Sequence, residues 1–188
     1  LLEGAPSSSP ISPADLDETS ATPLDEIMAD WARLYEQMGI ARKARACWRR
    51  AISAAKERGS HTSITVVRSY LSLARNYSLE QRFEDALKNY HEAVEAMFAL
   101  GVFQDRERLV HISPAAQKIS PRIVISLATE LFLELAHCHS VLGNHDLALE
   151  TLRAVIPFLQ GEDNPSLLLN ALFSGVILSC QATAKSEA

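Results

Sequence analysis

Three segments of the chain repeat one pattern of bulky and small residues, and this repetition constrains the fold more than any other feature of the sequence. Within each predicted helix, successive residues of the pattern are one, three or four positions apart, which places their side chains on one side of the helix. The interval between the ring-bearing residue and the following alanine is nine residues in all three segments. Each segment therefore predicts a pair of helices. The three copies are Met28-Trp31-Ala32-Tyr35-Ala44-Trp48, Tyr70-Leu73-Ala74-Tyr77-Ala86-Tyr90 and Phe132-Leu135-Ala136-His139-Ala148-Leu152.

Helix-start and helix-stop residues divide the repeated region into hairpins. Thr22-Pro23-Leu24-Asp25 places a capping hydroxyl before a proline and an acidic residue three positions after the cap. Glycines follow several of the predicted helices, where a left-handed backbone conformation is needed. We expect hairpins at about 23–58, 63–100 and 121–160, and a last helix over 165–183, which Asn164-Pro165 would start. The glycines are Gly39, Gly59, Gly101 and Gly143.

The repeated pattern resembles the tetratricopeptide repeat, W-x2-L-G-x2-Y followed by A-x3-F, over about residues 23–160. This resemblance implies an all-α fold, a right-handed superhelix of three antiparallel helix hairpins and a C-terminal capping helix. It further implies that the alanines let the two helices of a hairpin approach closely, and that the large side chains fill the space between hairpins. Those large residues are Trp31, Tyr35, Trp48, Tyr70, Tyr77, Tyr90 and Phe132.

The chain also departs from the tetratricopeptide pattern. Its copies are 42 and 62 residues apart, whereas the family period is about 34. Longer helices explain the first difference, and an insertion at 101–120 explains the second. The proline that commonly ends a repeat is missing. Extended repeats of this kind are similar to those of kinesin light chains and of scaffold subunits in large eukaryotic assemblies.

The flanking residues differ in composition from the repeats. Residues 1–21 are rich in Ser and Pro and predict a flexible leader, and 184–188 a short tail. Ser9-Pro10 and Ser12-Pro13 are either phosphorylation sites or ordinary linker composition. Because the chain opens without Met, we expect it to be a fragment of a longer polypeptide.

Charge, cysteine content and hydropathy disfavour several classes of protein. The net charge of −5 and the pI near 5.7 argue against a nucleic-acid partner. Cys47, Cys138 and Cys180 have no C-x2-C spacing, which is typical of an intracellular protein, cytoplasmic or nuclear. We expect no membrane span, since the nearest apolar stretch, Leu167 to Cys180, is interrupted by polar residues.

The tetratricopeptide resemblance implies a concave groove lined by the first helix of each hairpin. A peptide or helix of mixed charge would lie there, with a basic half at Arg33, Arg68 and Arg75 and an acidic half at Glu130 and Glu134. The same positions could equally be solvated faces. The implied groove positions are Glu26, Ala29, Arg33, Glu36, Arg68, Leu71, Arg75, Ser78, Glu130, Leu133, His137 and Ser140.

One subset of the family grips the C-terminal carboxylate of Hsp70 or Hsp90 through Lys and Asn residues of its first helices. Here Ala29 and Arg33, Ser72, and then Glu130 and Glu134 stand near those places. Two acids would repel a terminal carboxylate, so we do not expect a receptor for chaperone tails.

An enzyme or metal protein is the first rival hypothesis, and it depends on the cluster His137-Cys138-His139 with His145 nearby. Residues 137 and 139 are about 200° apart around a helix, so their imidazoles cannot share one ion. His139 also occupies the ring position of the repeat. We therefore expect no metal, no cofactor and no catalytic residue.

A structural subunit that self-associates is the second rival, and it depends on the last predicted helix. Leu169, Phe173, Val176 and Ile177 belong to more than one apolar stripe, whereas a capping helix needs a polar outer face. This helix would be an interface for a second copy or for a larger complex. The main hypothesis remains a non-enzymatic scaffold or adaptor that binds protein.

Overall fold

The computed structural model describes residues 22–59, 63–101, 121–160, 175 and 177. In this part of the chain the long ranges form six helices and no strand, so the predicted all-α class is confirmed. The predicted leader, insertion, tail and most of the last helix lie outside the described residues. The helices are α1 (Leu24–Gln37), α2 (Ala41–Glu57), α3 (Ile64–Leu79), α4 (Phe83–Ala99), α5 (Pro121–Val141) and α6 (His145–Gln160).

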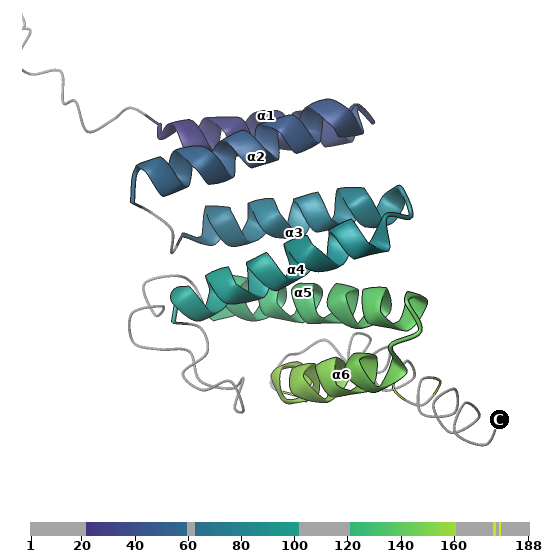
Figure 1. Ribbon diagram of the computed structural model, residues 1–188. Helices are drawn as coiled ribbons and strands as arrows, with labels where there is room; N and C mark the ends of the chain where they lie inside the picture. Colours follow the sequence, from purple (N-terminus) through teal and green to yellow (C-terminus); the bar gives the residue numbers. More distant parts are fainter. Residues whose placement is uncertain (1–21, 60–62, 102–120, 161–174, 176, 178–188) are drawn as a thin grey trace, which may run out of the picture.

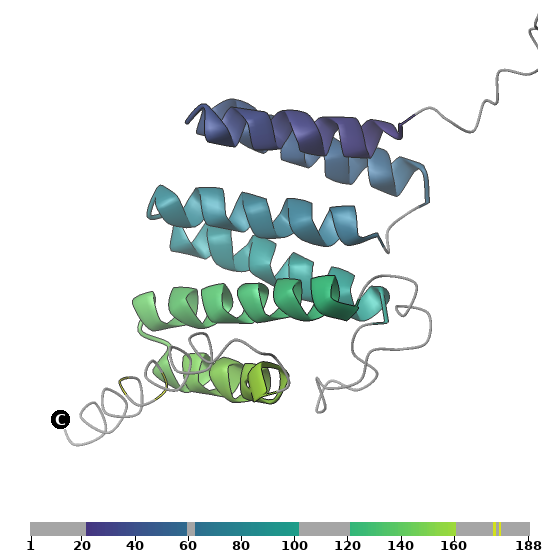
Figure 2. The same ribbon diagram turned by 180° about the vertical axis from the view of Figure 1, so that it is seen from behind.

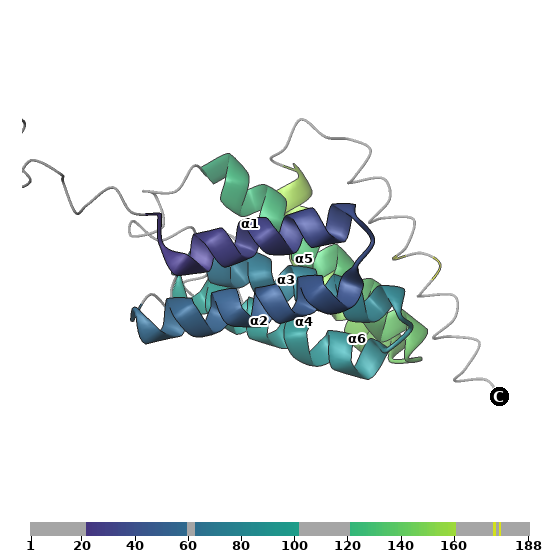
Figure 3. The same cartoon turned by 90° about the horizontal axis from the view of Figure 1, so that it is seen from above.

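The helices form a stack of three antiparallel pairs, α1 with α2, α3 with α4 and α5 with α6 (Figure 1). Successive pairs meet where α2 packs on α3 and where α4 packs on α5. The view from behind shows the three pairs as layers one below another (Figure 2). From above, α1 and α3 lie toward one side of the stack and α2 and α4 toward the other (Figure 3). The first helices are also direct neighbours, since α3 contacts both α1 and α5.

Small residues hold each pair together, as the repeat predicts. The six alanines of the pattern are at most 2% exposed, which confirms the close approach of the paired helices. They are Ala32, Ala44, Ala74, Ala86, Ala136 and Ala148.

The large residues of the pattern fill the core, with one exception. Trp48, Tyr70, Tyr77, Tyr90 and Phe132 are buried, and Tyr35 is partly buried against the core. The prediction for Trp31 is wrong, because its side chain is 49% exposed. It lies on a face of α1 that no described helix covers.

Backbone conformation explains most of the helix ends. Gly39, Gly59, Gly101 and Gly143 have φ between 72° and 77°, the left-handed region that costs glycine little.

The predicted cap of the first helix is wrong. Pro23, and not Thr22, is the N-cap residue, and no side chain caps this helix. The Pro23 carbonyl accepts hydrogen bonds from the backbone N–H groups of Glu26 and Ile27 instead.

The longest helix bears on the expectation about membrane spans. Arg122–Val141 of α5 is long and apolar enough to cross a membrane, with a mean hydropathy of 1.2. The expectation considered uninterrupted apolar runs only, whereas α5 mixes Leu, Ile and Val with polar residues. In the structure 56% of the apolar window is buried, and Val124 and Leu131 belong to the core. A core helix of this kind passes the same test of length and composition.

Candidate functional site

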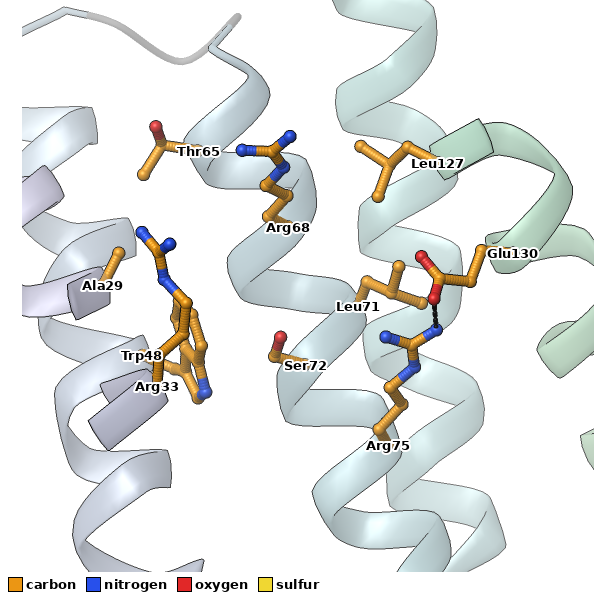
Figure 4. Close-up of a pocket in the computed structure, with 10 residues that line it drawn as sticks. All are labelled: Ala29, Arg33, Trp48, Thr65, Arg68, Leu71, Ser72, Arg75, Leu127 and Glu130. Carbon is orange, nitrogen blue, oxygen red and sulfur yellow. Dashed lines mark ion pairs between the residues drawn. The ribbon is translucent and has the colours of Figure 1, made fainter. Parts of the chain in front are cut away.

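A cavity of about 390 Å³ opens between α1, α3 and α5, on the side where the first helices meet (Figure 4). Its floor is apolar and belongs to the core, since Ala29, Trp48, Leu71 and Leu127 are between 2% and 6% exposed. The polar residues stand around this floor. They are Arg33, Thr65, Arg68, Ser72, Arg75 and Glu130.

A second cavity of about 410 Å³ extends the first along α5. It shares Arg68, Leu127 and Glu130 with the first cavity, and it adds Arg122 and Ser126, together with Ile123. The two cavities therefore form one elongated groove, which we call the α1–α3–α5 groove. A groove of this shape suits an extended segment better than a compact small molecule.

Arg75 closes one wall of the groove with two carboxylates of α5. Its Nη2 is 2.5 Å from Glu130 Oε1, and its Nε donates to Glu134 Oε1 over 2.8 Å. Tyr90 donates its hydroxyl proton to the other Glu134 oxygen at 2.8 Å. Burial alone would lower the pKa of Arg75, but the hydrogen bonds and charges of Glu130 and Glu134 raise it above its ordinary value. This network links the second and third pairs.

The network contradicts the predicted division of the groove into a basic and an acidic half. The positive charge of Arg75 is shared between the two glutamates, because α3 and α5 bring all three side chains within ion-pair distance, so Arg75 does not belong to a separate basic half. Burial raises the pKa of Tyr90, so its hydroxyl stays protonated as a donor to Glu134. Sequence alone gives no distance between residues 59 positions apart.

The free charge of the groove is positive. Arg68 and Arg122 are exposed, and neither forms an ion pair with any described residue. Arg33 pairs with Asp30 over 2.6 Å, but both side chains are more than half exposed, so water and salt weaken the pair. Figure 4 shows the guanidinium groups of Arg33 and Arg68 toward the Thr65 end of the groove, away from Arg75.

Glu36 is not free to bind a ligand. Its Oε1 accepts hydrogen bonds from Trp48 Nε1 at 2.8 Å and from Asn76 Nδ2 at 2.5 Å. The two donors come from α2 and α3, and both side chains are at most 5% exposed. Glu36 therefore joins three helices beneath the groove.

The remaining predicted groove positions divide between floor and periphery. Leu71, expected as an exposed contact, is a buried floor residue. Leu133 packs partly against the core and His137 is exposed, and neither lines the two cavities. The α5 residues that line the groove are Leu127 and Glu130, which lie about two turns and one turn before Leu133.

Several residues of the groove were not predicted, although the repeat register could have indicated two of them. Thr65 and Leu127 occupy the same position in the second and third copies, 62 residues apart and three residues before Arg68 and Glu130. A groove extended by one turn would have included both. Trp48 belongs to α2, and nothing in its sequence position indicates that its ring reaches the groove floor.

The histidines of the predicted cluster differ in their surroundings. His137 is exposed and His139 is 5% exposed, so their side chains point in different directions as their spacing predicts. The His139 ring lies 6.0 Å from the ring of His91, and burial together with His91 lowers the pKa of His139. Among the described residues no group of three or more His, Cys, Asp or Glu side chains could hold a metal ion.

The predicted interface on the last helix is mostly outside the described residues. Leu169, Phe173 and Val176 belong to the part that is not described. Ile177 is helical, and its side chain is 53% exposed. Self-association through this helix stays a prediction.

Comparison with solved structures identifies the kind of fold. No protein-family model and no curated protein sequence matches the chain. A solved structure, BtubC (BKLC) from P. vanneervenii, superposes with a TM-score of 0.66 at 20% sequence identity, over 89% of this chain. The fold is tetratricopeptide-like. This chain spans 60% of the length of BtubC.

A second solved structure resembles this chain more loosely than BtubC does. It is a putative kinesin light chain from Podosopora anserina with nearly identical TPR-like repeats. The TM-score is 0.38 at 15% identity, with 86% of this chain and 88% of that chain covered.

Proposed function

We propose that this chain is a non-enzymatic protein-interaction scaffold that binds a peptide segment or helix of a partner in the α1–α3–α5 groove. It would act as part of a larger protein or multisubunit complex. One observation carries the proposal: Arg68 is exposed and makes no ion pair with the described residues, and it stands beside the buried side chains of Leu71 and Leu127. An unpaired guanidinium beside an apolar floor suits a ligand that has both an acidic and an apolar side chain.

The groove chemistry narrows the ligand expected from the sequence. Arg68 would bind a carboxylate through two parallel hydrogen bonds, and Arg33 would add a second, weaker charge. An apolar side chain next to this acid would pack on Leu71 and Leu127. Glu130 is already paired with Arg75, so the proposed ligand is acidic and apolar rather than evenly mixed in charge.

The expected affinity is modest. Burying one apolar side chain contributes about 1.5 to 3 kcal/mol, and a hydrogen bond to a charged group about as much. Ordering a flexible segment opposes both contributions. We therefore expect a weak complex with a short peptide, with a Kd on the order of 0.1–1 mM.

A display experiment tests the proposal. A library of random peptides is selected on the immobilised chain, and the selected sequences are measured by fluorescence anisotropy. We expect Asp or Glu next to a large apolar residue, and about a tenfold loss of affinity for Arg68→Ala.

Arg50→Ala is the matched control, because Arg50 is also exposed and without an ion pair to a described residue, but it lies on α2 away from both cavities. Equal binding by wild type and Arg68→Ala, or an equal loss in both variants, would contradict a ligand site at Arg68.

A further inference from the structure

The outer face of α1 carries a continuous row of exposed apolar side chains. Their exposed fractions lie between 37% and 60%. Successive members are three, four, three and four residues apart, which is the a/d spacing of helices that pair along an apolar seam. We call this row the α1 seam. Its members are Leu24, Ile27, Trp31, Leu34 and Met38.

The same positions are buried in the other two copies of the repeat. The positions equivalent to the first four seam residues lie 42 residues later on α3 and 104 residues later on α5, and all eight are at most 5% exposed. The α1 seam is thus the one copy of this face that no described helix covers. The buried equivalents are Val66, Ser69, Leu73 and Asn76 on α3, and Ala128, Leu131, Leu135 and Cys138 on α5.

An antiparallel helix covers each buried face. On α3 the covering helix is α2, and Arg45 of α2 reaches Glu80, the equivalent of Met38, at 2.5 Å. On α5 the covering helix is α4, where the Cys138 thiol donates to the Phe83 carbonyl over 3.2 Å. The fold therefore specifies what the α1 seam lacks: a helix that runs antiparallel to α1.

We propose that a second copy of this chain supplies that helix, so that two α1 helices pair antiparallel across a two-fold axis near Trp31. The seam is nearly the same in both directions, with Leu24 and Met38 each seven residues from Trp31, and Ile27 and Leu34 four and three residues from it. Reversed on itself, it places Leu24 opposite Met38 and Ile27 opposite Leu34. A self-complementary patch of this kind is what a two-fold interface requires.

The surroundings of the seam suit such a pairing. The centroids of the Trp31 and Tyr35 rings are 6.1 Å apart, so two aromatic side chains lie together at the proposed axis. No seam residue is charged, and the nearby Asp30 is balanced by Arg33 at 2.6 Å. An exposed apolar row along a whole helix is unusual in a monomer and typical of an interface.

The N-terminal segment of the same chain does not fit the seam. Its large apolar residues are Leu1, Leu2, Ile11 and Leu16, whose spacing does not match the three-and-four alternation of α1. The second copy therefore matches the seam in pattern, and residues 1–21 do not.

Light scattering over a concentration series tests the proposal. We expect the wild-type mass to rise with concentration from 20.7 kDa toward twice that value. Leu34→Glu places a charge on each side of the axis and should raise the dimer dissociation constant at least about a hundredfold. Leu147→Glu is the matched control, because Leu147 on α6 is 48% exposed and Leu34 is 47% exposed. This control should dimerise like the wild type.

A second readout follows Trp31 itself. Acrylamide quenching should be strong in dilute wild-type protein and weaken as dimers form, since Trp48 is 2% exposed and contributes little. Circular dichroism and the melting temperature confirm that both Glu variants fold. A wild type that stays monomeric at every concentration would overturn the proposal, and so would a Leu34→Glu variant that still dimerises. Both outcomes leave the groove function untouched.

Discussion

Replacing Glu36 tests whether this residue is a structural link or a groove ligand. Glu36→Ala removes the acceptor of two hydrogen bonds, from Trp48 Nε1 at 2.8 Å and Asn76 Nδ2 at 2.5 Å. Both donors belong to buried side chains, so water cannot readily replace the lost oxygen. Each hydrogen bond to a charged group contributes about 1.5 to 3 kcal/mol. Because Glu36 is itself only partly buried, we expect a total loss of about 2 to 3 kcal/mol in the free energy of unfolding.

Thermal and urea unfolding followed by circular dichroism measure this loss. For a domain of this size it corresponds to a decrease of about 4 to 12 °C in Tm. Glu36→Gln retains one acceptor oxygen and should lose about half as much. Glu26→Ala, an exposed residue on the same helix, should change the stability by less than about 0.5 kcal/mol. A Glu36→Ala variant as stable as Glu26→Ala would refute the linking role.

Four further predictions follow from buried or strained positions. Ala86→Leu should destabilise the chain by about 1 to 3 kcal/mol through overpacking, which an unchanged Tm would contradict. Gln81 has φ 60°, so Gln81→Gly should raise Tm or leave it unchanged, whereas a clear decrease would show that the backbone is not strained there. Burial and His91 lower the pKa of His139 from 6.5. The neutral His139 side chain therefore contributes to stability above pH 6.5, and this contribution is lost as the pH falls. His139→Gln should flatten the fall in Tm below pH 6.5. Burial raises the pKa of Cys138 to about 11, so this thiol should resist alkylation at pH 8 until urea unfolds the chain, as mass spectrometry of the labelled peptides will show.

The fold was predictable because its packing rules are local. An alanine at a fixed sequence interval from an aromatic residue indicates where two helices pack closely, and a glycine after a helix indicates where that helix ends. The turn between α3 and α4 shows the limit of that rule. Gln81 adopts the left-handed conformation at the position equivalent to Gly39 and Gly143, and its residue type gives no sign of it.

The groove was predictable in place but not in charge. Sequence register places Arg68 on the side of α3 where the structure has the cavity. The sequence does not reveal that Arg75 forms ion pairs with Glu130 and Glu134, because these pairs depend on how α3 packs against α5. Glu36 was misassigned for the same reason, since its partners come from two other helices.

Trp31 illustrates a third kind of error. Its place in the repeat predicts burial, but burial also needs a neighbouring helix, and none of the described helices covers that face of α1. A repeat pattern states which face of a helix is apolar, and the neighbouring helix decides whether that face is covered.

The proposed function requires that a peptide segment binds in the α1–α3–α5 groove at Arg68. Amide chemical-shift mapping with a display-selected peptide tests it most directly. We expect shifts concentrated around Thr65, Arg68 and Leu127, which Arg68→Ala reduces at equal peptide concentration. Shifts concentrated on the outer faces of α2 and α4, and unchanged in Arg68→Ala, would contradict it.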